Sequence, residues 1–404
     1  MIGAGLFSAF TPAAAAAGSG LLVGLLLAAV VAWCNATSSA QLAARYPVAG
    51  GTYHYGREQL GPWWGFAAGW GFVVGKTASS AAMALTFAAY ALPPGWWQRP
   101  AAAAALVVLA LVNCRGITRT AKLTRVIVTV VLVGLAVILT AVVVTAILPA
   151  EADATWSRLG PAEAHGGWYG VLQAGGLLFF AFAGYARIAT LGEEVRDPAR
   201  TIPRAIVLAL LAAVTLYAIV GCLELAALGA DGIASTATPL VEALSFGALH
   251  EVAPWLVRVI AAIASLGALL ALIAGIGRTT LAMARTGDLP RVLAAVHPTY
   301  RVPHRAELAT ALVAVVAVLT VDLRSVIGFS SFGVLLYYAV ANLSALRQPE
   351  TDRRFPRVFQ VIGIAGCLAL AAALPIGSVV AGVAVFLVGF AYRGARLALQ
   401  RSRT

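Results

Sequence analysis

The sequence has little charge. Asp, Glu, Lys and Arg make up 11% of its 404 residues, while 61% are hydrophobic. A soluble domain carries about 25% charged and 45–50% apolar residues, and an apolar run of about 20 residues can cross a bilayer. The shortage of charge therefore excludes a soluble enzyme, a DNA-binding module and a disordered protein. It indicates a polytopic helical membrane protein.

Cysteine is equally scarce, and its distribution suggests no bound group. Cys34, Cys114, Cys222 and Cys367 lie in or beside apolar runs, without a CxxC pair or a close Cys/His cluster. Neither a disulfide framework nor a metal centre is expected from this pattern. The apolar runs also lack a carboxylate pair or a nucleophile–base arrangement. We therefore expect no cofactor, no metal and no enzymatic activity.

Apolar segments follow one another along the whole chain, bounded by charged residues, proline or glycine. We count twelve of them and expect twelve membrane-crossing helices. They are residues 1–17, 20–44, 63–92, 101–114, 123–148, 169–191, 202–228, 254–283, 306–321, 326–346, 358–373 and 376–392.

The net charge of +12 has a topological explanation. On a soluble domain it would suggest nucleic acid, whereas in a membrane protein the loops rich in Lys and Arg face the cytoplasm. With the loop after the second segment placed inside, 22 of the 28 Lys and Arg residues fall on the cytoplasmic side and 4 outside, and Lys76 and Arg187 lie within segments. We expect both termini in the cytoplasm and no nucleic-acid partner.

The first apolar segment begins directly at Met1, without a positively charged leader. A signal peptide is therefore not expected. A charged amino group inside the bilayer costs about 2.5–3.5 kcal/mol. A short first helix that starts at the interface would avoid this cost, but we expect instead that the native chain begins upstream of Met1.

Glycine interrupts the first and sixth segments, which are five apart. The first opens with Gly-Ala-Gly at 3–5, and the sixth carries Gly-Gly at 175–176. Glycine weakens a helix by about 1 kcal/mol relative to alanine, although small residues in membrane helices usually serve close packing. Paired interruptions in two inverted halves are typical of a transporter binding site, where amide groups face an anion and carbonyls face a cation. A zwitterionic amino acid offers both charges.

Short motifs occur in a fixed order over nearly the whole chain. They are IGAGLF at 2–7, LAARYPVAGGTY at 42–53, LGP at 60–62, FFAFAG at 179–184, GEEVRDP at 192–198, IP at 202–203, AMARTGDLP at 282–290 and VHP at 296–298. Together they resemble the amino acid–polyamine–organocation (APC) superfamily, specifically its bacterial amino acid permeases. The matched regions are the first helix, the first cytoplasmic loop, the sixth helix with its loop, and the loop after helix eight.

The resemblance implies an all-α polytopic membrane protein of the LeuT type, with a five-plus-five inverted repeat and two extra C-terminal helices. Its first helix looks truncated here. Residues 1–148 would form the first repeat, residues 149–347 the second, and residues 348–404 the peripheral spans eleven and twelve with a basic cytoplasmic tail.

The resemblance also implies a substrate site between the first and sixth helices. Backbone amides of the first helix would hold the substrate carboxylate. Carbonyls of the sixth helix would receive the α-ammonium, and the Phe180 ring would pack over the substrate as a gate. The implied substrate-binding residues are Ile2, Gly3, Ala4, Gly5, Phe180, Ala183 and Gly184.

One lysine lies near the middle of the third segment. Lys76 has a dozen or more uncharged residues on either side, which is too deep for easy snorkelling and indicates a functional role. Since burial disfavours the charged form of a lysine, Lys76 could exchange a proton during transport. Our hypothesis is that it supplies the positive charge that sodium, or a lysine of helix five, supplies in relatives. The alternative is a packing cation bonded to carbonyls of the interrupted helices.

Four further residues give weaker signals. Arg187 is expected in the cytoplasmic half of the sixth segment, lining the inner vestibule. Glu224, near the outer end of the seventh segment, is expected to be interfacial rather than a proton relay. Tyr337 and Tyr338 could gate from the tenth segment.

These patterns predict an integral protein of the cytoplasmic membrane that moves amino acids by alternating access. Proton-coupled uptake is the expected mode, so the expected partners are a small amino acid substrate, protons and the lipid bilayer. An amino acid or polyamine exchanger is one alternative. A transporter-like sensor or truncated remnant that does not transport is another.

Overall fold

The computed structural model describes residues 2–47, 50–116, 121–148, 157–160, 165–184, 197–245 and 250–401. Within these ranges the protein is helical and contains no β-strand, as expected for an all-α fold. Its α-helices are α1 (Ala4–Ser8), α2 (Phe10–Ala17), α3 (Leu21–Arg45), α4 (Thr52–Leu60), α5 (Pro62–Ala91), α6 (Gln98–Cys114), α7 (Ala121–Val142), α9 (Gly167–Phe182), α10 (Pro198–Ser235), α11 (Pro239–Glu242), α12 (Ala253–Arg285), α13 (His304–Thr320), α14 (Leu323–Leu346), α15 (Arg357–Ala373) and α16 (Ile376–Arg401). A π-helical turn, η2 (Val143–Ile147), extends α7.

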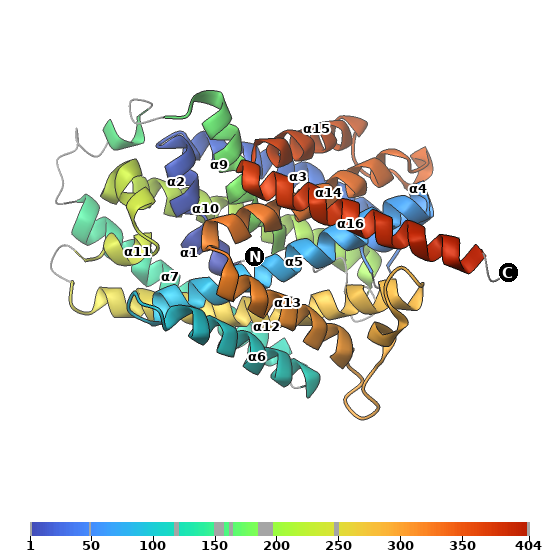
Figure 1. The fold of residues 1–404 in the computed structure, drawn as a ribbon. Helices are drawn as coiled ribbons and strands as arrows, with labels where there is room; N and C mark the ends of the chain where they lie inside the picture. Colours follow the sequence, from blue (N-terminus) through green and yellow to red (C-terminus); the bar gives the residue numbers. More distant parts are fainter. Residues whose placement is uncertain are drawn as a thin grey trace.

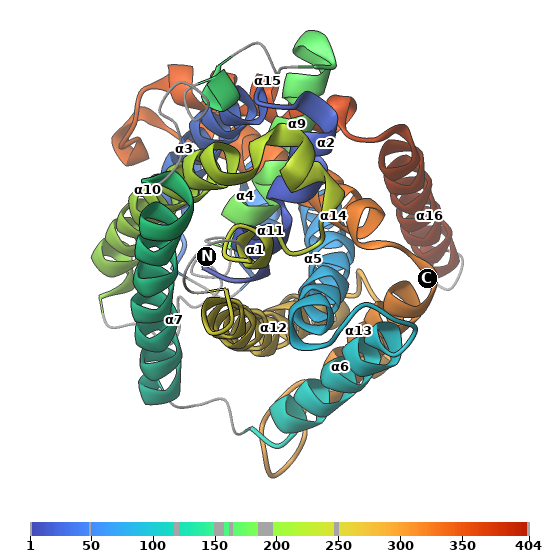
Figure 2. The same cartoon turned by 90° about the vertical axis from the view of Figure 1, so that its left-hand side faces the viewer.

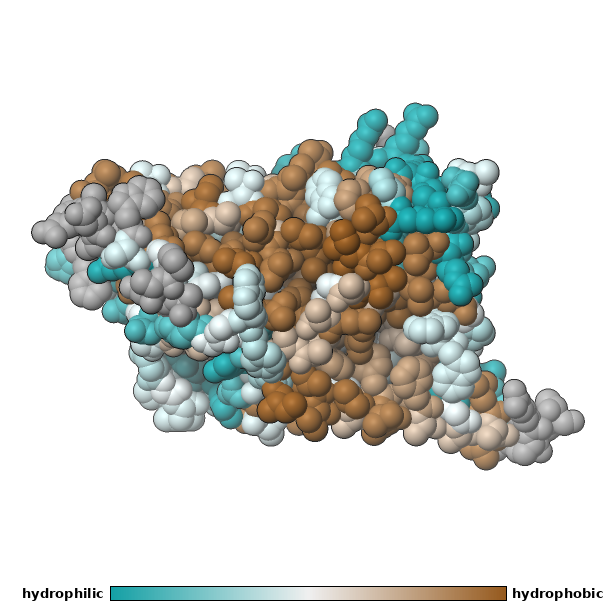
Figure 3. Space-filling model, turned by 90° about the horizontal axis from the view of Figure 1, so that it is seen from above, coloured by the Kyte–Doolittle hydropathy of each residue, from teal (hydrophilic) through white to brown (hydrophobic). Residues whose placement is uncertain are grey.

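Seven helices of the described chain are long and apolar enough to cross a membrane: α3, α5, α7 with η2, α10, α12, α14 and α16. α6, α9 and α15 are shorter apolar helices. Each of the twelve expected segments contains a helix in its described residues, the first segment both α1 and α2. Residues 185–191 of the sixth segment lie outside the described residues. Figure 3 shows hydrophobic residues over the middle of one face and hydrophilic residues toward its ends, as a membrane-embedded bundle requires.

The helices form one bundle in which α5 is central. α5 packs against α12, α13 and α14, while α3 packs against α9, α10 and α15. In the view along the bundle, α7 and α16 lie at opposite flanks (Figure 2). The short α1 lies inside the bundle, against α5, α9 and α12, so its first residues are near the centre of the molecule (Figure 1).

One end of the bundle is fastened by a cluster of ionised and hydroxyl side chains around Asp288, in the loop after α12. Its carboxylate accepts hydrogen bonds from Arg57 of α4 at 2.9 Å and Tyr53 of α4 at 2.7 Å, and pairs with Arg393 of α16 at 3.0 Å. Burial raises the pKa of Tyr53 to about 12, so it remains a hydroxyl donor at neutral pH. We call this end the arginine-rich end.

The opposite end carries three of the arginines expected outside, each donating to a backbone carbonyl. Arg99 donates to Leu319, Arg158 to Ala226 and Ala227, and Arg258 to Tyr90. Ala226 and Ala227 lie just before a kink in α10 at Gly229 (φ 70°, ψ 172°). The three arginines therefore donate to carbonyls near a helix end or kink, where intrahelical donors are missing. The two sets of arginines predicted on opposite sides of the membrane therefore lie at opposite ends of the bundle.

Candidate functional site

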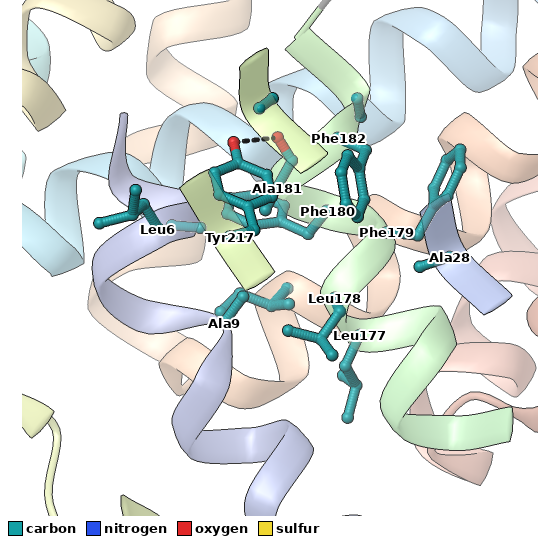
Figure 4. Close-up of a cluster of buried hydrophobic side chains, with 14 of the residues drawn as sticks. Leu6, Ala9, Ala28, Leu177, Leu178, Phe179, Phe180, Ala181, Phe182 and Tyr217 are labelled. Carbon is teal, nitrogen blue, oxygen red and sulfur yellow. Dashed lines mark hydrogen bonds between the residues drawn. The ribbon is translucent and has the colours of Figure 1, made fainter. Parts of the chain in front are cut away.

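α1 and the end of α9 meet at the centre of the bundle. The interruption predicted at Gly175 and Gly176 is wrong, because both lie inside the continuous helix α9, where they allow close packing against α3 and α15. A Cβ atom on Gly5 would lie 2.6 Å from the Cα of Ala181, closer than real side chains approach. Only glycine at this position allows the two backbones to come so near. Figure 4 shows Leu6 and Ala9 beside the aromatic run of α9 at this crossing. The predicted pairing of the first and sixth segments is thus a direct backbone contact.

The start of α1 leaves backbone amides without helical partners. Gly3 is extended (φ −165°, ψ −155°) and has no side-chain cap, and the helix begins at Ala4. The amides of Ala4 and Gly5 precede the first intrahelical donor, because Leu6 is the first residue whose N–H donates within the helix, to the Gly3 carbonyl at 3.1 Å. These two amides are the groups that the sequence assigns to a substrate carboxylate.

The end of α9 presents two carbonyls, each already held by a side chain from another helix. The Ala181 carbonyl accepts a hydrogen bond of 2.9 Å from the hydroxyl of Tyr217 in α10 (Figure 4). The Ala183 carbonyl accepts one of 2.8 Å from the ammonium of Lys76 in α5. Since α9 ends at Phe182 and its last carbonyls have no helical donors, these two side chains complete the helix end.

Lys76 is 4% exposed. Among the residues that the structure describes, no carboxylate lies within salt-bridge distance of its ammonium, and the Ala183 carbonyl is its one hydrogen-bond acceptor. An ammonium group has three donors. A buried cation with a single acceptor is costly unless it is paired or loses its charge. The charge state of Lys76 therefore depends on whether a further acceptor or an anion lies beside its ammonium group.

Aromatic side chains surround the crossing. The Tyr90 hydroxyl of α5 donates to the Phe7 carbonyl of α1 at 2.8 Å, and the two rings pack edge to face. Phe180 is 5% exposed and belongs to the main hydrophobic core. Phe179 packs edge to face on Tyr338 of α14. A substrate at the crossing would therefore meet backbone polar groups and aromatic rings.

The structure brings most of the predicted site residues together. Gly5 contacts Ala181, and Lys76 contacts Ala183. Ile2 packs on the core, and Gly184, the last described residue of its segment, is exposed. Arg187 lies outside the described residues. The roles assigned to these residues stay predictions.

Sequence reasoning missed two residues of this site, Tyr90 and Tyr217. Both are 0% exposed, and each hydroxyl bonds a carbonyl of α1 or α9. Neither lies in a motif, and a tyrosine within an apolar segment is an ordinary packing residue. A buried tyrosine hydroxyl usually has a hydrogen-bond partner, so both residues could have been expected to bond a polar group. The sequence does not show that these groups are carbonyls of α1 and α9.

The fold and the site define a polytopic helical membrane protein in which α1 and the end of α9 meet at the centre of the bundle. The chain belongs to the amino acid permease family, whose sequence profile matches residues 1–395. This family falls within the APC superfamily that the motifs resemble.

Several characterised and uncharacterised transporters are similar to this chain. An uncharacterized transporter of Mycobacterium tuberculosis is 57% identical over 403 residues, covering 99% of this chain and 89% of the relative. The methylthioribose transporter of Bacillus subtilis is 27% identical, covering 88% and 80%. The branched-chain amino acid permease of the same organism is 25% identical, covering 90% and 81%. All three names are those of transport proteins.

Proposed function

We propose that this protein is a secondary active transporter that moves amino acids across the cytoplasmic membrane by alternating access, coupled to proton uptake. The observation that carries the proposal is the crossing of α1 and α9, with Lys76 bonded to the end of α9. Membership of the amino acid permease family supports it. The inverted-repeat organisation, with repeats at 1–148 and 149–347 and peripheral spans at 348–404, is part of the proposal.

Substrate binding would use the polar backbone at the crossing. The amides of Ala4 and Gly5 would hold the carboxylate of the amino acid, because they are donors without helical acceptors. The α-ammonium would bind the carbonyl side of α9, including Ala183. Phe180 would pack over the bound substrate. In such a site the protein backbone would bind the carboxylate and ammonium that all amino acids share. The substrate side chain would contact the surrounding aromatic rings.

The position of Lys76 suggests how a proton is coupled to this binding. A protonated Lys76 would hold the end of α9 through the Ala183 carbonyl. That carbonyl oxygen has a second lone pair for the substrate ammonium, and a zwitterionic substrate adds no net charge to the site. The proton at Lys76 and the substrate would then bind together from outside and leave together inside, as proton-coupled uptake requires.

The orientation follows from the charges. The arginine-rich end, with Arg57 and Arg393, would face the cytoplasm, and the end with Arg158 and Arg258 would face outward. Both termini would then be cytoplasmic.

Uptake of radiolabelled compounds into proteoliposomes, with and without an imposed pH gradient, tests the proposal. The panel should contain branched-chain, cationic and small neutral amino acids, a polyamine, and methylthioribose, because relatives are named for several of these classes. We expect gradient-driven accumulation of at least one amino acid. Uptake only against a preloaded substrate would indicate an exchanger, and no transport of any compound would contradict the proposal.

A further inference from the structure

Glu224 is a buried carboxyl group to which the proposed transport cycle gives no role. It lies in α10, is 0% exposed, and neither of its side-chain oxygens has a hydrogen-bond partner among the described residues. It is seven residues after Tyr217, so both side chains project from the same face of α10 toward the interior. Gly221, one turn earlier on this face, packs on the Phe10 ring of α2.

The cations nearest this end of α10 are occupied elsewhere. Arg158 donates to the carbonyls of Ala226 and Ala227, and Arg258 of α12 donates to the carbonyl of Tyr90. α2 and the adjoining half of α3 carry no titratable side chain. Glu242 of α11 is half-buried and of the same charge sign, and Asp231 and His165 pair with each other at the surface. An ionised Glu224 would thus be buried with no countercharge, a state that proteins avoid.

Tyr90 of α5 lies within electrostatic range of Glu224, so a charge on the carboxylate would act on its hydroxyl. Its hydroxyl donates its single proton to the Phe7 carbonyl and so fastens α1 to the outer end of α5. A carboxylate is a stronger acceptor than a peptide carbonyl. If Glu224 were ionised, it would compete for the Tyr90 hydroxyl or for Arg258, and α1 would lose this attachment.

We propose that Glu224 is a proton-binding residue on the outer side of the substrate site, and that its protonated form keeps α1 fastened to α5 through Tyr90. When the outer side opens, the Glu224 carboxyl releases its proton to the outer water, and the carboxylate accepts a hydrogen bond from Tyr90 or Arg258. When a proton returns from the outer water, Tyr90 bonds Phe7 again and the outer side closes. Glu224 thus controls the opening and closing of the outer side and carries no proton across the membrane. The inference rests on the proposed transport function and adds a second proton site to it, separate from Lys76.

A direct test is infrared difference spectroscopy of the purified protein in lipid vesicles. At neutral pH, the wild type minus Glu224→Gln should show the carbonyl band of a protonated carboxyl. Asp231→Asn is the matched control, since it removes a carboxyl of the same helix whose side chain is 98% exposed. It should show no such band. Identical wild-type and Glu224→Gln spectra would overturn the proposal whether or not the protein transports.

Transport supplies the second readout. Glu224→Gln mimics the protonated form that keeps the outer side closed, so it should lose most of the rate of both uptake and exchange. Glu224→Asp can still ionise and should keep both. Wild-type rates of uptake and exchange in Glu224→Gln would overturn the proposal. Absence of transport in the wild type would contradict the transport function, and the infrared measurement would then decide on Glu224.

Discussion

The Lys76 ammonium donates a hydrogen bond of 2.8 Å to the carbonyl of Ala183, which ties the middle of α5 to the end of α9. The two residues are 107 positions apart in the chain. Through this bond, the lysine that the sequence places at mid-membrane contacts the helix end to which we assign the substrate ammonium. The proposed coupling residue and the proposed substrate site therefore lie at one place in the structure.

Replacing Lys76 by methionine tests the coupling role. Methionine keeps the unbranched apolar stem but cannot donate to Ala183 or carry a proton, so exchange should persist while stimulation by a pH gradient is lost. Uptake measured over a range of external pH values checks this. Thr77→Val is the control, because the Thr77 hydroxyl bonds only the Val73 carbonyl of its own helix. A Lys76→Met protein with unchanged pH dependence would leave Lys76 a packing residue.

The close approach of α1 and α9 predicts a large effect of a small substitution. In Gly5→Ala the new methyl group would lie 2.6 Å from Ala181 Cα and 2.8 Å from Ala181 Cβ, so the helices must separate. Overpacking of this kind costs about 1–3 kcal/mol. We expect loss of uptake and a lower unfolding temperature.

The matched control is Gly394→Ala in α16, where an added Cβ meets no atom within 4 Å. Alanine is the better helix former by roughly 0.5–1 kcal/mol, so this variant should be as stable as the wild type or more stable. Equal uptake by Gly5→Ala and the wild type would contradict the crossing.

The hydroxyl of Tyr217 should contribute to both stability and binding. Tyr217→Phe removes the donor to the buried Ala181 carbonyl, at a cost of about 1–3 kcal/mol for an acceptor left without its partner. We expect a lower unfolding temperature and a raised KM for uptake. Tyr55→Phe is the control, since the Tyr55 hydroxyl is equally buried but has no hydrogen-bond partner among the described residues. If both variants behave alike, the hydrogen bond to α9 is unimportant.

The Asp288 cluster should stabilise the arginine-rich end. Asp288→Asn leaves Arg393, itself 5% exposed, without its countercharge. Breaking a buried pair costs about 3–5 kcal/mol, so thermal unfolding of the purified protein should occur at a clearly lower temperature. Glu350→Gln, which disrupts exposed pairs with Arg353 and Arg357, should change little. Comparable losses in both variants would show that burial of the cluster does not matter.

The membrane helices were predictable from the sequence because crossing a bilayer requires a long apolar segment. Each of the twelve expected segments contains a helix within the residues that the structure describes. α4 was not predicted. It is short and polar, and it is bounded by glycines with positive φ at Gly51 and Gly61, so hydropathy gives no sign of it. Its position depends on Asp288, which comes from a distant loop.

The candidate site was predictable only in part. The glycines at 3–5 and the lysine at 76 stand out because each is unusual in an apolar helix. Tyr90 and Tyr217 do not stand out, since their roles arise from which carbonyl lies opposite each hydroxyl. Glu224 was expected at the membrane interface, but it is fully buried. Its burial follows from the packing of α10 against α2 and α3, which no local pattern encodes.

The central claim is that this protein accumulates an amino acid at the expense of a proton gradient. The most direct measurement is the steady-state ratio of internal to external amino acid in proteoliposomes, as a function of the imposed pH difference. One pH unit provides about 1.4 kcal/mol per proton, and one proton per substrate then gives about tenfold accumulation. The account predicts a ratio that rises with the gradient and collapses when a protonophore is added. A ratio that stays at unity for every amino acid and amine tested would contradict it.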